Sequence, residues 1–189
     1  ALIAVNTCLY MLEGGERLDE LAEHTERSTA FLRATNSGGT LEVVQAFGQF
    51  ARCLRGRTRG PASFDDERYD HAATVQGMAA QNNVAGLAIV YLLEQVAAFI
   101  ADDPQASLEA AARLQGVLRA VVAMAVRPTH VFYRALALAA RHDTLPQAEQ
   151  AEGLRAIAQH AADLRHWAEH CRENYGARHA LVAAELARL

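Results

Sequence analysis

VAGLAIVYLLEQVAAFIA, residues Val84 to Ala101, is the most hydrophobic stretch of this 189-residue chain. Apolar side chains recur along it at steps of three and four residues, and the opposite side is also apolar as far as Glu94. A helix that is apolar all round packs against neighbours on several sides. Its uninterrupted apolar run ends at Leu93, about half the ~20 residues that a membrane-spanning helix needs. The stretch therefore predicts a buried, central helix.

Segments with helical periodicity lie on both sides of this central helix. Alanine, leucine, arginine and glutamate dominate them, and these residues are strong helix formers. Alternating runs of β-branched and aromatic residues, which a sheet would need, are missing. Asp103-Pro104 predicts one helix start, and Thr144 with Gln147 predicts another as a capping box. Helices are expected over 1–12, 16–35, 41–54, 65–80, 84–101, 103–126, 128–142, 144–171 and 178–189.

The expected connections between these helices are short, so that sequence neighbours pack as antiparallel pairs. The pairs repeat at a spacing of about 40 residues, which is typical of helical-repeat arrays. We therefore expect one all-α domain over 1–189, with eight or nine helices stacked as a superhelix rather than closed into a globular bundle. Both ends of the sequence lie within helical pattern, so we expect a segment excised from a longer protein.

Every cationic side chain of the Lys+Arg total of 18 is an arginine, and the formal net charge is −4. Without lysine the segment cannot be a conventional P-loop ATPase, a protein kinase or a Schiff-base enzyme. The acidic balance gives no electrostatic footprint for nucleic acid. The densest basic stretch can be interpreted as a phosphate-binding loop or as a solvated helix end, and we favour the second. It comprises Arg52, Arg55, Arg57 and Arg59.

The three cysteines, Cys8, Cys53 and Cys171, are far apart and odd in number. No CxxC pair is present for zinc or redox chemistry. Each lies on an apolar helical face, where a free cysteine behaves as a small hydrophobic residue. This usage favours a reducing, cytoplasmic compartment.

A cluster of possible metal ligands lies on the segment 144–171, with Cys171 beside it: His160, Asp163, His166 and His170. Zinc and di-iron sites use ligands three and four residues apart on one helical face. The apolar seam of this helix contains Leu154, Ile157 and Leu164, and the histidines are predicted to point away from it. We therefore expect a solvated histidine face near the helix C-terminus, with a metal-dependent enzyme as the disfavoured alternative.

Other chemically suggestive residues have equally ordinary interpretations. His130 and His142 flank an apolar helix with Tyr133 and could line a ligand groove, although positions at interfaces or helix ends fit better. The single tryptophan, Trp167, is expected to anchor the long helix against the last one, and only an exposed indole would make it a binding hot spot. An acidic and imidazole patch on the segment 65–80 is expected to be a solvated face; it contains Glu67, Asp70 and His71.

The C-terminal sequence WAEHCRENY, from Trp167 to Tyr175, and LVAAELAR, from Leu181 to Arg188, resembles the end of the helical-repeat region of very large bacterial signalling proteins. Weaker matches follow in the expected order along nearly the whole chain, at 15–21, 54–65 and 128–136. Arg172 stands where the family would be expected to have proline. In such proteins a serine/threonine kinase domain and an AAA-type ATPase domain precede the helical region, and GAF and histidine kinase domains follow.

The resemblance implies a tetratricopeptide-like regulatory scaffold between an ATPase switch and its output modules. We therefore expect a non-enzymatic segment without cofactor that binds protein partners or its own flanking domains, since repeat stacks present long concave surfaces. The alternative is a small-molecule sensor with an apolar pocket between 84–101 and 128–142. The candidate pocket or interface residues are Tyr91, His130, Phe132, Tyr133 and Trp167.

Overall fold

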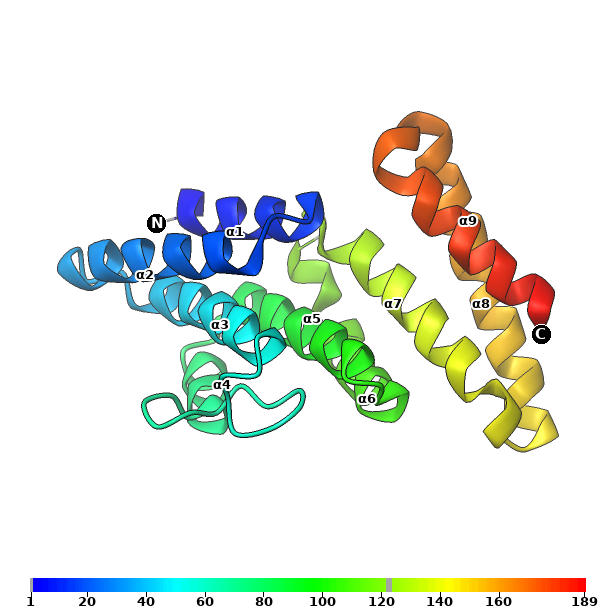
Figure 1. Ribbon diagram of the computed structural model, residues 1–189, viewed down its shortest axis with the longest axis horizontal. Coiled ribbons are helices and arrows are strands. Elements are labelled where there is room, and N and C mark those ends of the chain that lie inside the picture. The colour runs from blue at the N-terminus through cyan, green and yellow to red at the C-terminus, as the bar shows by residue number, and fades with distance from the viewer. Residues whose placement is uncertain (1, 122–123) are drawn as a thin grey trace.

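The computed structural model describes residues 2–121 and 124–189, and this part of the chain is helical without any strand. Figure 1 shows helices stacked side by side along the long axis of the molecule. The predicted all-α fold with eight or nine helices is confirmed. The α-helices in the described ranges are α1 (Leu2–Gly14), α2 (Leu18–Ala34), α3 (Gly38–Leu54), α4 (His71–Ala80), α5 (Val84–Ile100), α6 (Pro104–Val117), α7 (Val126–Arg141), α8 (Gln147–His170) and α9 (Arg172–Arg188). Short 3-10 helices, η1 (Leu118–Val121) and η2 (His142–Thr144), precede α7 and α8.

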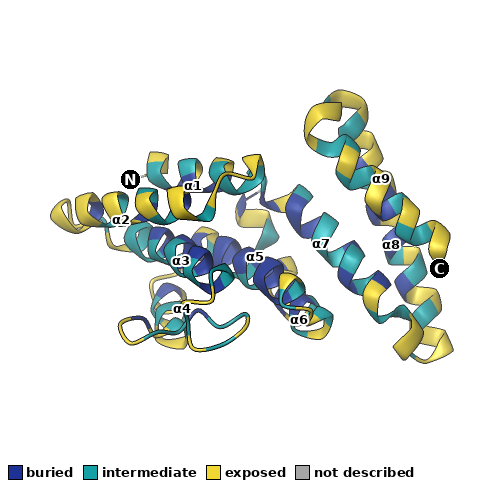
Figure 2. Cartoon of the chain, in the orientation of Figure 1, coloured by how far each residue is buried: buried dark blue, intermediate teal, exposed yellow. Residues whose placement is uncertain are grey.

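Helix α5 is central, as its two apolar faces predict. It packs against α3, α4, α6, η1 and α7, and most of its residues are buried (Figure 2). The start of α5 is fixed by Asn83, whose side-chain oxygen accepts the Gly86 N–H at 3.0 Å and whose amide donates to the Gly39 carbonyl at 2.9 Å. One side chain thus caps α5 and ties it to the start of α3.

The apolar core falls into two clusters that meet along α7. The first cluster takes its buried residues from α1 to α6 and η1, and ends with Val126 at the start of α7. The second is built from Val131, Ala135 and Ala139 of α7 together with buried residues of α8 and α9. Figure 1 shows α7 lying between the two groups of helices. No helix in the described ranges is both long enough and apolar enough to cross a bilayer.

The predicted helix over 65–80 begins only at His71. The carboxylate of Asp66 accepts two backbone N–H groups just downstream, at 2.7 and 3.0 Å, and so holds the chain in a turn. Asp70 then acts as the N-cap of α4. Local side-chain hydrogen bonds of this kind compete with helix formation and shorten the helix.

The helix predicted to end near 126 stops at Val117, and η1 follows it; positions 122 and 123 lie outside the described residues. Pro128, predicted to begin the next helix, lies inside the first turn of α7. Proline is tolerated there because the first N–H groups of a helix have no intrahelical partner. Asp103-Pro104 starts α6 as predicted, with the Asp103 side chain accepting the Ala106 N–H at 2.9 Å.

Two further boundary predictions are wrong. Thr144 does not form a capping box, because its hydroxyl donates to the Arg141 carbonyl at 2.8 Å and Pro146 occupies the N-cap of α8. The turn predicted over 172–176 is confined to Cys171, and α9 begins directly at Arg172. The extended backbone of this single residue is enough to reverse the chain between two packed helices.

Candidate functional site

A cleft of about 440 Å³ lies where the two apolar clusters meet, and we call it the junction cleft. It brings together His130 of α7 with His160 and Asp163 of α8. From the sequence, His130 was a candidate for a ligand groove, and the other two were candidates for a metal cluster. Three arginines, Arg119, Arg127 and Arg134, share the cleft with them. The remaining lining residues are Gln115, Leu118 and Val131.

His130 is fixed by Gln95 at the base of the cleft. The Gln95 amide donates to the His130 carbonyl at 3.0 Å, so its oxygen must accept from the ring Nδ1, which lies 2.9 Å away. Nδ1 therefore carries the proton and Nε2 is the acceptor. Gln115 Oε1 lies 3.2 Å from Nε2; a neutral ring protonated on Nδ1 cannot donate to this oxygen, so a hydrogen bond here requires the Gln115 amide to turn its NH₂ group towards Nε2. Burial, helped by the positive charge of Arg134, lowers the pKa of His130 from 6.5 to about 3, so the ring is neutral.

His160 lies deep in the same cleft with only 9% of its surface exposed. Neither ring nitrogen has a hydrogen-bond partner within the described part of the chain. Burial, together with the positive charge of Arg134 and against the effect of Asp163, lowers the pKa of His160 from 6.5 to about 4. The site therefore holds a neutral imidazole with one free donor and one free acceptor. Buried polar side chains normally have partners, so this one is an exception.

The cleft is positively charged although the chain as a whole is acidic. Arg134 is half-buried, whereas Arg119 and Arg127 are exposed, and the described residues form no ion pair with any of the three. The guanidinium of Arg127 lies 6.0 Å from the centre of the Trp167 ring. Asp163 is the single carboxylate that lines the cleft, and its Oδ1 accepts from the Gln159 amide at 3.0 Å.

The structure separates the histidine cluster that the sequence placed on one solvated face. His166 and His170 are exposed, with ring centres 4.9 Å apart. His160 is buried, so the prediction of a solvated position is wrong for this residue. His160 lies three residues after Ile157 and four before Leu164 and so shares their buried face of α8, whereas His166 lies on another side. No group of three His, Cys, Asp or Glu residues in 2–121 and 124–189 is arranged to hold a metal ion.

The other predicted pocket residues do not gather around one cavity. Tyr91 of α5 lies under the guanidinium of Arg113, 5.2 Å from its ring centre. Tyr133 packs edge-on against Phe99 with ring centres 5.6 Å apart, in the α5–α7 interface. Phe132 contacts Tyr133 at 5.1 Å. None of these three aromatic residues lines the junction cleft.

Trp167 is half-buried and lies 6.0 Å from the ring centre of Tyr175 in α9. It also packs against the apolar cluster of α7, α8 and α9. The indole thus contacts the last helix, as its position beside the apolar seam predicts.

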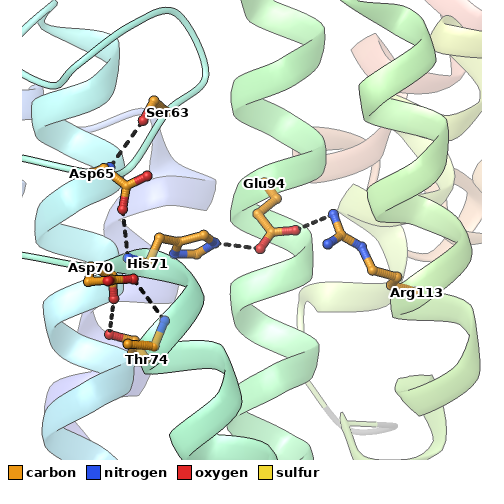
Figure 3. Close-up of polar contacts among 8 residues, drawn as sticks. Ser63, Asp65, Asp70, His71, Thr74, Glu94 and Arg113 are labelled. Carbon is orange, nitrogen blue, oxygen red and sulfur yellow. Dashed lines mark hydrogen bonds and ion pairs between the residues drawn. The ribbon is translucent and has the colours of Figure 1, made fainter.

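A second polar cluster links α4, α5 and α6 through Glu94 (Figure 3). One oxygen of Glu94 lies 2.6 Å from Nε2 of His71, and the other accepts from Arg113 at 2.6 Å. The prediction of a solvated patch is therefore wrong for His71, whose side chain is only 19% exposed. The nearby hydroxyls of Ser63 and Thr74 are engaged with the backbone and do not contact the imidazole. The cluster holds three helices together and lacks a nucleophile.

The larger groove, of about 810 Å³, lies between α2, α3 and the loop over 55–70. Its most enclosed polar groups pair with one another, because Asp66 contacts Arg52 at 3.2 Å and the Gln49 amide at 3.1 Å. Tyr69 also lines it, and burial raises the pKa of its hydroxyl to about 12, with smaller contributions from nearby carboxylates. The oxygen of the Gln49 amide and the Tyr69 hydroxyl are buried without a hydrogen-bond partner among the described residues, so this groove also contains polar atoms that are not paired.

Sequence analysis missed the arginines of the junction cleft. Arg127, His130 and Arg134 follow one another at steps of three and four residues, so they share one face of α7. His160 and Asp163 have the same relation on α8. The spacing of the polar residues on α7, or of those on α8, could have predicted a polar face. The prediction followed the apolar residues of the two helices instead. Comparison with models of protein families, with curated proteins and with solved structures finds no match.

Proposed function

We propose that this chain is a non-catalytic regulatory scaffold of the tetratricopeptide-like kind, working in the cytoplasm within a larger kinase and ATPase signalling protein. It would bind protein partners or flanking domains and transmit conformational state between them. The observation that carries the proposal is the division of the core into two apolar clusters joined across α7 by polar contacts. The C-terminal sequence resemblance supports the same class of protein.

The polar contacts at the junction connect distant parts of the sequence. Thr129 of α7 donates to Glu13 of α1 and accepts from Arg178 of α9 at 3.0 Å. Arg178 also pairs directly with Glu13 at 2.8 Å. A second contact is the Gln95–His130 pair between α5 and α7. The first and last helices of the described chain are thereby tied to the helix between them.

This arrangement suits a module that changes state. Well-packed apolar cores resist gradual deformation, whereas directional hydrogen bonds can be exchanged as discrete sets. The two clusters share α7, where polar contacts and the edge-on contact of Phe99 with Tyr133 link them. We expect the clusters to move relative to each other more readily than either core deforms. A shift imposed on one end of the stack would appear at the other as a rearrangement around Thr129.

Hydrogen exchange on the full-length protein with and without ATP tests the proposal. Peptides that contain Glu13, Thr129 and Arg178 should change protection between the two states, while peptides from α3 and α5 stay constant. Glu13→Gln should weaken the nucleotide-dependent change, and Glu23→Gln, a matched change in an exposed ion pair, should leave it intact. Identical exchange profiles in both nucleotide states would exclude transmission through this segment.

A small-molecule sensor is the second candidate. The unpartnered imidazole of His160 in the junction cleft favours it, although the cleft is polar and lies between α7 and α8 rather than between α5 and α7. A ligand there would contact helices of both clusters.

A further inference from the structure

We propose that the junction cleft binds a small dianion, a phosphate monoester or a dicarboxylate, with Arg134 and His160 as its principal contacts. This ligand site does not depend on the scaffold function proposed above, and it gives the sensor alternative a chemical class of ligand. Three features support it: an unpartnered buried side chain, the charge of the cleft, and the size and position of the cleft.

His160 supplies the first observation. An imidazole buried to this extent without a hydrogen-bond partner destabilises a folded chain. Both of its ring nitrogens lack a partner within 2–121 and 124–189, and the side chain lines the cleft. A ligand oxygen would accept from the N–H of the neutral ring, and a ligand hydroxyl would donate to the other nitrogen. Both nitrogens are closed to solvent as well as unpaired, so the ring must turn towards the cleft before a ligand can complete these contacts.

The charges of the cleft determine the class of ligand. Three guanidinium groups and one carboxylate line it, so the excess is two positive charges while both histidines are neutral. Arg134 lines the cleft together with His130 and His160, and its positive charge contributes to the lowered pKa of both rings. Guanidinium groups bind carboxylates and phosphates through paired hydrogen bonds. A dianion would balance the excess charge and contact the half-buried arginine.

The volume and position of the cleft bear on the rest of the ligand. About 440 Å³ lies within the range of small-molecule sites and is much larger than a single phosphate or carboxylate group. The side chains of Leu118 and Val131 provide an apolar wall for the remainder of the molecule. The lining residues come from α6 and η1 on one side and from α7 and α8 on the other, so a bound ligand would contact both apolar clusters.

Nuclear magnetic resonance of the imidazole protons tests the site, with inorganic phosphate and succinate as the two probes at constant ionic strength. The His160 signal, assigned with His160→Leu, should shift saturably with at least one probe, and the His166 signal should not. Phosphate alone would indicate a phosphate monoester, and succinate alone a dicarboxylate. A bound dianion should also raise the pKa of His160, against burial and the charge of Arg134 and in the same direction as Asp163; the other groups that line the cleft are Arg119, Arg127 and the neutral His130.

Two arginine variants distinguish the cleft from general surface attraction. Arg134→Gln should weaken probe binding about 10- to 100-fold, the value of a hydrogen-bonded charge contact. Arg155→Gln removes an exposed positive charge from α8 outside the cleft and should bind as the wild type does. The proposal is overturned if neither probe moves the His160 signal, if both variants bind alike, or if the shifts gather around Arg52 and Arg57 in the larger groove. None of these outcomes depends on nucleotide-dependent exchange, so the two proposals can fail separately.

Discussion

Replacing His160 by leucine should stabilise the unliganded protein. The wild-type side chain is 9% exposed and neither ring nitrogen has a partner among the described residues. Leaving a buried polar group unsatisfied costs about 1–3 kcal/mol. Leucine has a similar volume and would extend the apolar cluster around Ile157 and Leu164. We expect His160→Leu to raise the free energy of unfolding by about 1–2 kcal/mol at pH 7.5, since the new shape will not fit perfectly.

The advantage of the variant should grow as the pH falls. In the folded protein the pKa of His160 is lowered from 6.5 to about 4, so between these values the unfolded chain binds the extra proton. Proton binding therefore lowers the free energy of unfolding of the wild type as the pH falls below about 6.5, and this decrease is complete near pH 4. At pH 5 the free energy of unfolding has decreased by about 2 kcal/mol through this effect, because each unit of pKa difference that has been crossed is worth about 1.4 kcal/mol. His130 contributes the same pH dependence to both proteins and cancels in the comparison.

Urea denaturation followed by circular dichroism at pH 7.5, 6 and 5 measures the difference. His166→Leu is the matched control, because His166 is exposed on the same helix and its replacement should change stability by less than about 0.5 kcal/mol. A destabilised His160→Leu protein, or a difference from wild type that does not widen towards pH 5, would refute the reasoning. Either result would mean that His160 has a partner in the folded protein.

Other contacts make separate predictions. Gln95→Leu should cost about 2–4 kcal/mol in urea denaturation, because it leaves the ring N–H of His130 unpaired in the core and removes a second hydrogen bond from the helical carbonyl of the same residue; a loss below about 1 kcal/mol would contradict the assigned tautomer. Arg178→Met should cost about 2 kcal/mol and expose α9 to faster hydrogen exchange, since Glu13 then remains partly buried without its partner; unchanged exchange in α9 would show that the tie is not needed. Asp103→Ala should lower the free energy of unfolding by about 1 kcal/mol through loss of the N-cap of α6, and a neutral effect in thermal denaturation would argue against that cap.

Helical periodicity was sufficient to predict the all-α class and the central position of α5. Both depend on short-range properties: helix formers at most positions, apolar residues on two faces, and a capping residue such as Asp103. The boundaries that failed depend on competing local hydrogen bonds. Asp66 and Thr144 bond to the backbone in turns, and a propensity argument cannot show which of two such arrangements a packed chain will adopt.

The burial of His160 could have been read from the sequence of α8. His160 lies three residues after Ile157 and four before Leu164, so it shares their face of the helix. The prediction grouped it instead with His166, which lies about a third of a turn away and is exposed. What the sequence could not show is that the same face of α8 meets the arginines of α7, because that contact depends on how the two helices pack.

Contacts between residues a few positions apart set the helices, their approximate bounds and the enclosed position of α5, so these features can be read from the sequence. Which helices meet depends on the packing of the whole chain. The ion pair of Glu13 with Arg178 joins two residues far apart in the sequence, and the junction cleft brings the α7 arginines beside His160. The packing of the whole stack selects such neighbours, because no helical period links their positions.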